Sequence, residues 1–133
     1  MASVIQAGVI PRRDGRICLI NSSDGLRWIV PKGHIDEGFT PPEAAAQEAW
    51  EEAGLRGTIH PDSVGRYSYR KFGQNYVVEL FSMDVSQVEA RWPEMSFRRR
   101  LWLAPAEAAE VVSIPELARL LLDFAFRIAE PVE

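Results

Sequence analysis

Three glutamates near the middle of the chain have the spacing to act together in chemistry. Glu48, Glu51 and Glu52 stand at i, i+3 and i+4, so on a helix their carboxylates share one face. Like charges at this spacing destabilise a helix, and no Lys or Arg occurs between Gly33 and Leu55 to offset them. A divalent cation would offset them, because carboxylate oxygens at this spacing suit Mg²⁺ or Mn²⁺. The alternative interpretation is a solvated acidic helix face that holds no ligand.

The residues around these glutamates predict the helix that positions them. Thr40-Pro41-Pro42-Glu43 is a capping box with proline at the first helical position, and Gly54 is a stop signal. The face opposite the carboxylates carries Ala46, Ala49, Trp50 and Ala53. This face is apolar and mostly small, so we expect the helix to lie close against a sheet.

Other segments predict that sheet and two further helices. Apolar runs rich in β-branched residues predict strands at 4–10, 16–21, 28–30, 58–69, 76–85 and 99–103. Arg13-Asp14-Gly15 predicts a hairpin turn between the first two strands. A second helix is expected at 113–129 and a short one at 105–111. Strands before, between and after helices indicate an α/β or α+β fold with helices packed on a mixed sheet.

Composition indicates one ordinary globular domain spanning residues 1–133. Hydrophobic residues make up 47% of the chain and charged residues 26%, which excludes a disordered or collagen-like chain. The net charge of −4 excludes a broad nucleic-acid-binding surface. Thirteen of the fifteen basic residues are Arg, however, and the planar guanidinium suits phosphate and carboxylate. This bias hints at anion recognition, although a GC-rich genome would produce the same bias.

The sequence also predicts the surroundings of the protein. Cys18 is the single cysteine and lies in an apolar run, so we expect a buried thiol and no disulfide. No apolar stretch is long enough for a membrane span, and the first ten residues lack the pattern of a signal peptide. We therefore expect a cytoplasmic protein that binds neither membrane nor nucleic acid.

The segment 33–55, GHIDEGFTPPEAAAQEAWEEAGL, resembles the signature of the Nudix hydrolases. The signature positions that match in register are Gly33, Glu48, Glu51, Glu52, Gly54 and Leu55, with Ala49 at an aliphatic position. The resemblance implies an α/β/α sandwich around a central mixed sheet. It also implies metal-dependent hydrolysis of a nucleoside diphosphate linked to another moiety, or of a related pyrophosphate bond.

Two positions depart from that signature. Phe39 stands where the family has its first glutamate, and Gln47 stands where it has an arginine. In the family these two side chains typically pair, so both partners of one ion pair are replaced together. We interpret Phe39 and Gln47 as a rebuilt, uncharged brace between the loop and the helix.

The resemblance assigns roles to the matching residues. Glu48, Glu51 and Glu52 are the predicted metal ligands, and the backbone carbonyl of Lys32, next to Gly33, is a further one. Glu52 or Glu48 is the predicted catalytic base, and the spacing does not choose between them. Glu79 is a weaker candidate acid, since a glutamate on a strand can equally face solvent.

Residues outside the signature bear on the substrate. Trp28 before Pro31-Lys32-Gly33, together with the run from Trp92 to Trp102, resembles the family branch that hydrolyses diadenosine polyphosphates and diphosphoinositol polyphosphates. The corresponding phosphate-binding candidates are Arg12, Arg13, Lys32, Arg70, Lys71, Arg98, Arg99 and Arg100. Side chains alternate along a strand, so either Arg98 and Arg100 or Arg99 alone can face the site. The alternative for this trio is an edge strand protected by charge.

The leading hypothesis is a Mg²⁺- or Mn²⁺-dependent hydrolase of a small polyphosphate, with a dinucleoside polyphosphate favoured over a diphosphoinositol polyphosphate. A second hypothesis is a nucleoside triphosphate pyrophosphohydrolase that removes damaged nucleotides. A third is a binding module that has kept the fold and lost most catalysis. The sequence leaves open whether the chain forms a homodimer.

Overall fold

The computed structural model describes residues 2–129, with side chains described as far as Phe124. Eight strands form one sheet: β1 (Val4–Arg13), β2 (Arg16–Asn21), β3 (Trp28–Ile29), β4 (Lys32–His34), β5 (Leu55–Ile59), β6 (Gly65–Lys71), β7 (Gln74–Val88) and β8 (Arg100–Leu103). The helices are α1 (Pro41–Ala53), α2 (Pro105–Val111) and α3 (Pro115–Ala129). None of the described helices is both long and apolar enough to span a membrane.

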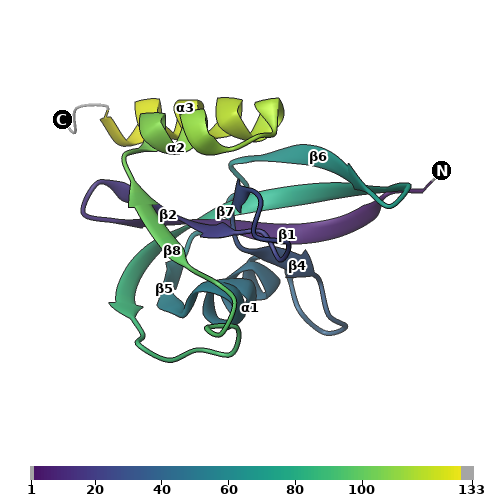
Figure 1. Ribbon diagram of the computed structural model, residues 1–133, viewed down its shortest axis with the longest axis horizontal. Helices are drawn as coiled ribbons and strands as arrows, with labels where there is room; N and C mark the ends of the chain where they lie inside the picture. Colours follow the sequence, from purple (N-terminus) through teal and green to yellow (C-terminus); the bar gives the residue numbers. More distant parts are fainter. Residues whose placement is uncertain (1, 130–133) are drawn as a thin grey trace.

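The sheet is mixed and lies between two helical layers. Its central pair, β1 and β7, is parallel, while the other pairings are antiparallel. Figure 1 shows α2 and α3 on one face of the sheet and α1 on the other. The predicted α/β/α sandwich with a central mixed sheet is therefore confirmed.

The sheet forks at both edges of its central pair. Along one edge, the first half of β1 pairs with β4 and its last residues pair with β2. Along the other edge, β6 pairs with the first half of β7 and β5 with the second half. In place of the single strand predicted at 58–69, the chain forms the end of β5 and most of β6. Both strands pair with the same edge of β7, and residues 60–64 separate them. Pro61, which lacks a backbone N–H, lies in this interruption.

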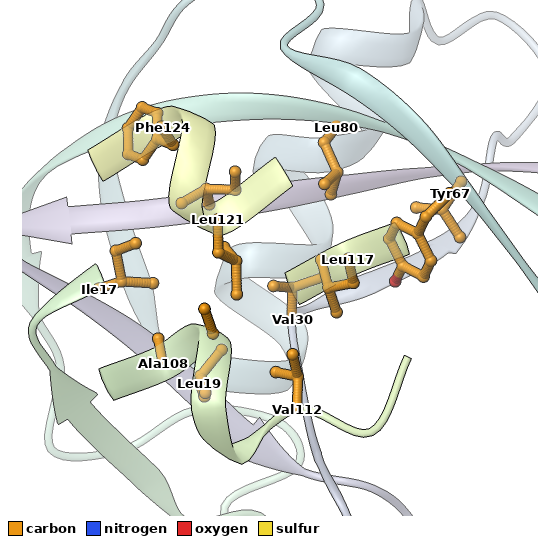
Figure 2. Packing of buried hydrophobic residues seen from close by; sticks show 13 residues of the cluster. Ile17, Leu19, Val30, Tyr67, Leu80, Ala108, Val112, Leu117, Leu121 and Phe124 are labelled. Atoms are coloured by element: carbon orange, nitrogen blue, oxygen red, sulfur yellow. The ribbon is translucent and has the colours of Figure 1, made fainter. Parts of the chain in front are cut away.

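Each face of the sheet has its own apolar core. Figure 2 shows the core beneath α2 and α3, where Leu117 and Leu121 pack with Leu80 and Tyr67. The core beneath α1 contains alanines of the helix, Phe81 and Met83 of β7, and the free thiol of Cys18. Burial raises the pKa of this thiol to about 12, as expected for a packing residue.

The small side chains of α1 bring it close to the sheet. Ala49 and Ala53 of the predicted apolar face are fully buried, whereas Ala46 is half-buried and Ala45, outside that prediction, is fully buried. Trp50 is only half-buried and lies beneath the guanidinium of Arg56, with the Arg56 Cζ 3.9 Å from the ring centroid. The helix therefore packs through alanines, and Trp50 of the predicted apolar face contacts Arg56 instead of the core cluster.

The turns follow the predicted signals, with one short strand unpredicted. Asp14 and Gly15 adopt φ values of 53° and 75°, which form the tight turn between β1 and β2. Thr40 and Glu43 form the reciprocal capping box at the start of α1. Strand β4 has no signal in the sequence, because three residues after Pro31 are too few for an alternating pattern to appear.

Candidate active site

The acidic face of α1 lies against the short strand β4. Gly33 approaches the helix so closely that an added Cβ would stand 2.5 Å from the carboxyl carbon of Glu48. Beside it, the backbone N–H of Lys32 donates a hydrogen bond to Glu52 Oε1 at 2.9 Å. Gly33 thus leaves room for the Glu48 carboxylate, and β4 holds Glu52 through the Lys32 N–H.

The three glutamates share the predicted helix face but turn to different partners. Glu52 is buried and lies between the Lys32 N–H and the guanidinium of Arg98. Glu51 accepts a hydrogen bond from Gln47 Nε2 at 2.8 Å, one turn earlier on the helix. Glu48 has no hydrogen-bond partner among the described residues and faces Gly33.

Gln47 and Phe39 have different surroundings, so the predicted brace between them is not formed by a hydrogen bond among the described residues. Gln47 binds along the helix to Glu51, and Phe39 is 40% exposed. The loop before α1 is closed instead by its own backbone, where Phe39 N donates to Asp36 O at 3.0 Å and Gly38 takes a φ of 88°. Local turn chemistry therefore holds the loop where the family pattern would place an ion pair.

Burial and mutual repulsion alter the acidity of this cluster. Burial raises the pKa of Glu48 to about 8, and the neighbouring carboxylates of Glu52 and Glu51 contribute to that rise. Burial also raises the pKa of Glu52 to about 7, although the Lys32 N–H and Arg98 oppose that shift. The pKa of Lys32 itself is lowered, mainly by burial. Ionisation of these carboxylates is therefore disfavoured in the protein alone, and a bound cation would favour the ionised form.

The segment after β7 fixes the end of α1 that carries Glu51 and Glu52. Its residues supply donors to the last three helical carbonyl oxygens, which have no partner within a helix. Glu94 N donates to Glu51 O (3.1 Å), Trp92 Nε1 to Glu52 O (3.0 Å) and Arg100 Nη1 to Ala53 O (3.1 Å). The last turn has no basic residue of its own, so Arg100 supplies the cation that favours a helix C-terminus.

Gly54 makes this close packing feasible. It ends α1 in the left-handed region, with a φ of 67°, and its N–H bonds back to the helix. A Cβ at this position would also stand 2.8 Å from the ring of Trp92. Gly54 therefore both ends the helix and leaves room for the indole ring of Trp92.

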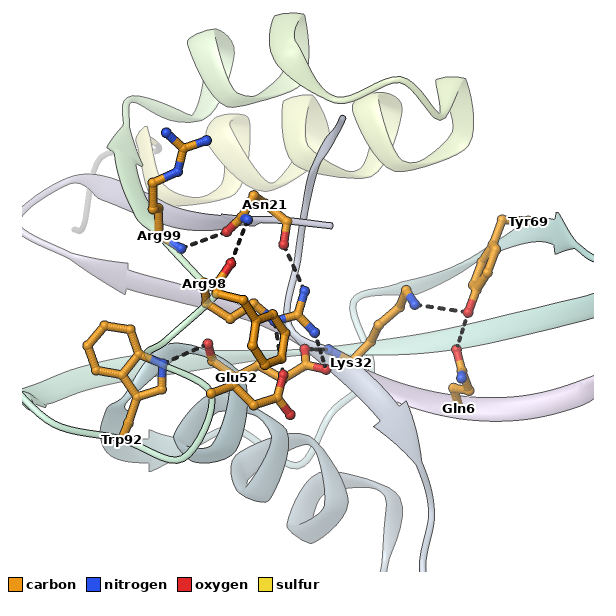
Figure 3. Close-up of polar contacts among 10 residues, drawn as sticks. Gln6, Asn21, Lys32, Glu52, Tyr69, Trp92, Arg98 and Arg99 are labelled. Carbon is orange, nitrogen blue, oxygen red and sulfur yellow. Dashed lines mark hydrogen bonds and ion pairs between the residues drawn. The ribbon is translucent and has the colours of Figure 1, made fainter. Parts of the chain in front are cut away.

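A polar cavity with a volume of about 230 Å³ opens beside Glu52. Its cationic lining residues are Arg27, Lys32, Lys71 and Arg98. Lys32 Nζ donates to the Tyr69 hydroxyl at 2.9 Å, which in turn donates to Gln6 Oε1 at 2.8 Å (Figure 3). Tyr69 and Tyr76 also line the cavity and stack on each other, with ring centroids 4.8 Å apart. The cavity thus combines one carboxylate, four cations and an aromatic pair.

The predicted phosphate-binding residues divide by position. Lys32, Lys71 and Arg98 line the cavity, whereas Arg70 lies on the β6–β7 hairpin and donates to Asn75 Oδ1 at 3.0 Å. Of the Arg trio, only Arg100 lies on β8, so the expected alternation along one strand does not apply. Arg98 and Arg100 bond to α1, while Arg99 lies near the ring of Trp28.

Three of the predicted phosphate-binding residues, Arg12, Arg13 and Arg100, do not line this cavity. Arg12 and Arg13 lie at the far end of β1, about 20 Å along the strand from Gln6. Arg12 is paired there with Asp84 at 2.9 Å, at a separate groove (the hairpin is at the left in Figure 1). Arg100 donates to Ala53 O and Glu89 O and thus serves as a helix cap. Residue types alone do not reveal distances along the sheet.

Several residues of this site carry no signal in the sequence. Gln6, Asn21 and Tyr69 are polar side chains within strands, and nothing in their local pattern distinguishes them from ordinary strand residues. Arg27 lies in the loop between β2 and β3, next to the Trp28 that was singled out. Only proximity to that motif could have indicated Arg27.

The carboxylates of α1 are suitable ligands for a divalent cation, but their side chains do not converge on one point. Among the described residues, no three Asp, Glu, His or Cys side chains converge where they could hold one metal ion. Glu51 accepts from Gln47, and Glu52 contacts the Lys32 N–H and Arg98, so the carboxylates have different partners. Glu48 and Glu52 nevertheless raise the local negative charge together, which a hard cation would neutralise.

A family model and several relatives match most of this chain. The family model described as the NUDIX domain matches residues 3–124. The mitochondrial Nudix hydrolase 13 of Arabidopsis thaliana is 29% identical over 125 residues, covering 86% of this chain and 62% of that protein. A MutT-like protein of Streptomyces ambofaciens is 32% identical over 119 residues, covering 90% of this chain and 75% of that protein.

Solved structures agree with the sequence matches. A C. elegans Ap4A hydrolase in a binary complex is 26% identical, with a TM-score of 0.71, and the match covers 95% of this chain and 98% of that one. The chain spans less than two thirds of the length of several Arabidopsis relatives.

Proposed function

The chain belongs to the NUDIX domain family, and from that premise we propose that it is a divalent-metal-dependent hydrolase of phosphoanhydride bonds. One observation carries the proposal: Glu52 of the acidic helix lines the same cavity as four cations. Carboxylates bind a metal ion and cations bind phosphate oxygens, so both halves of a metal–polyphosphate complex have partners here. The preferred metal in this proposal is Mg²⁺, with Mn²⁺ as the alternative.

In this mechanism, Glu48, Glu51 and Glu52 would hold the metal, with the Lys32 backbone carbonyl as a further ligand. The bound metal would lower the pKa of a water molecule and neutralise the phosphate charge. Lys32, Lys71 and Arg27 orient the phosphate chain from the cavity wall. Glu52 or Glu48 would accept the proton of the attacking water, as a general base within reach of it.

We infer that the substrate is a dinucleoside polyphosphate. The stacked rings of Tyr69 and Tyr76 line the cavity next to its cations, and aromatic rings suit a nucleobase better than an inositol ring. The C. elegans neighbour is an Ap4A hydrolase, which is in line with this class of substrate. The remaining alternatives are a diphosphoinositol polyphosphate and a nucleoside triphosphate cleaved to a monophosphate and pyrophosphate.

The test is a substrate panel with product identification. Purified protein is incubated with Mg²⁺ or Mn²⁺ and each of the three substrate classes at mildly alkaline pH, and the products are identified by chromatography. We expect hydrolysis of the dinucleoside polyphosphate. Release of pyrophosphate from nucleoside triphosphates alone would support the nucleotide-cleansing alternative, and binding without turnover of any substrate would support the binding module.

Two matched variants test the assignment of Glu52. We expect Glu52→Gln to lose at least about 100-fold in kcat, which is the contribution typical of general base catalysis. Glu110→Gln removes the same charge at an exposed position of α2, on the face of the sheet opposite to α1. This variant should leave kcat unchanged. Unchanged activity of Glu52→Gln would refute the assignment.

Two further expectations belong to this proposal. We propose a cytoplasmic enzyme whose partner is a small molecule, and fractionation of cells that express a tagged chain would test the location. Light scattering of the purified protein would establish whether it is a monomer or a homodimer.

A further inference from the structure

We propose that Arg98 is a positioning residue for Glu52, holding its carboxylate in one orientation from outside the acidic helix. The inference rests on the proposed function in so far as Glu52 takes part in hydrolysis. The contact itself is a property of the protein without metal or substrate. It can therefore be tested even if the enzyme proposal fails.

The guanidinium of Arg98 is bound on three sides. Nη2 lies 3.3 Å from Glu52 Oε2, Nε lies 3.0 Å from Glu94 Oε1, and Nη1 donates to Asn21 O at 2.8 Å (Figure 3). The side chains of Arg98 and Glu52 are only 8% and 11% exposed, so water screens this ion pair weakly. Each nitrogen of the planar fork has an acceptor, which fixes the direction of the group.

Asn21 fixes the backbone on both sides of Arg98. Its Nδ2 donates to Phe97 O at 2.9 Å, and its Oδ1 accepts from Arg99 N at 2.6 Å. Asn21 is the last residue of β2 and is itself buried. The central sheet therefore holds the main chain before and after Arg98, while the Asn21 carbonyl holds its guanidinium.

Glu52 is consequently held at both oxygens. Oε1 accepts from the Lys32 N–H and Oε2 faces Arg98, so rotation of the carboxylate would break one contact or the other. Each oxygen keeps a second lone pair for another partner. Helix α1 contains no cation, so the only charge that orients Glu52 among the described ion pairs comes from Arg98.

This role differs from phosphate binding, although Arg98 also borders the cavity. Three of its five N–H groups are already used by the protein. Loss of a residue that binds substrate equally in ground and transition states raises KM, whereas loss of a positioning residue lowers kcat. The two roles therefore predict different kinetic changes.

The test compares three single variants by NMR and by kinetics. Arg98→Gln removes the charge, Arg98→Lys keeps the charge without the planar fork, and Arg99→Gln is the matched control in the same segment. Arg99 is exposed and lies near Trp28, away from Glu52. The NMR readout is the Lys32 amide proton in metal-free protein, because its shift depends on the hydrogen bond to Glu52.

We expect the Lys32 amide proton to move upfield in Arg98→Gln and to stay in place in Arg99→Gln. With substrate, we expect Arg98→Gln to lose about 100-fold in kcat with KM nearly unchanged, since a misplaced catalytic group costs that much. Arg98→Lys should show the same changes to a smaller extent, and it carries the test if Arg98→Gln fails to fold. The proposal is overturned if the Lys32 amide stays in place in both Arg98 variants, or if they raise KM without lowering kcat.

Discussion

Gly33 offers a way to move one carboxylate without altering its chemistry. In Gly33→Ala, the new Cβ would stand 2.5 Å from the carboxyl carbon and Oε1 of Glu48. Ordinary contacts begin at 3.4 Å, so the carboxylate must retreat by about 0.9 Å. A displacement of this size at a catalytic group costs on the order of 100-fold in rate, so we expect kcat to fall by about that factor.

The same change should affect stability little. The group that must move is the flexible end of a side chain, and Gly33 has no left-handed φ that would strain an alanine. Gly8→Ala, on the neighbouring strand, is the matched control, because its Cβ would meet Val78 Cγ1 at 2.9 Å and Leu80 Cδ2 at 3.0 Å. Overpacking this apolar site should cost about 1–3 kcal/mol of unfolding free energy.

Steady-state kinetics and thermal unfolding of both variants test the reasoning. Gly33→Ala should lose activity and keep its Tm, and Gly8→Ala should lose Tm without a comparable fall in the kcat of the folded protein. Wild-type kcat in Gly33→Ala would show that the position of Glu48 does not matter. A large loss of Tm in Gly33→Ala would show that its inactivity reflects folding.

Three further predictions concern stability. The folded protein without metal binds protons at Glu48 and Glu52 more tightly than the unfolded chain does. The contribution of these two groups to stability is therefore largest below about pH 4.5 and is lost as the pH rises to about 8. The contribution of Glu52 is on the order of 3 kcal/mol. Added Mg²⁺ should raise the Tm more at pH 8 than at pH 5. An equal rise in Tm at both pH values would contradict the pKa shifts. Arg100→Gln should cost about 1.5–3 kcal/mol in denaturant unfolding, because it removes charge-assisted bonds to Ala53 O and Glu89 O, and an unchanged midpoint would refute the capping role. Tyr67→Phe should raise the unfolding free energy by about 1 kcal/mol, because its buried hydroxyl has no hydrogen-bond partner in the described structure, and destabilisation would reveal an unseen partner.

Features controlled by neighbouring residues could be predicted from the sequence. The capping box at Thr40 and the stop at Gly54 set the bounds of α1, and Asp14-Gly15 set the first hairpin. Each depends on the backbone preferences of a few adjacent residues. The same holds for the shared face of the three glutamates, since helical periodicity alone determines it.

Features controlled by contacts between distant segments could not be predicted. The ion pair between Arg98 and Glu52 joins residues 46 positions apart, and no local pattern announces it. The residue type of Arg12 predicts a phosphate-binding role, but the structure places Arg12 at the far end of β1, beside a separate groove. Residue type indicated the chemistry, while the pairing of the strands determined which residues meet.

The contacts at the end of α1 also impose an order on assembly of the site during synthesis. Glu52 leaves the ribosome long before Trp92 and Arg98, so the acidic helix end must exist for some time without its donors and its cation. Contacts across such a separation form late, because the entropy of closing the intervening chain must first be overcome. A chain released before residue 98 would retain the helix signals and all three glutamates, yet Glu52 would be held on one side only. The arrangement of the site therefore depends on residues just before β8, which emerge long after α1.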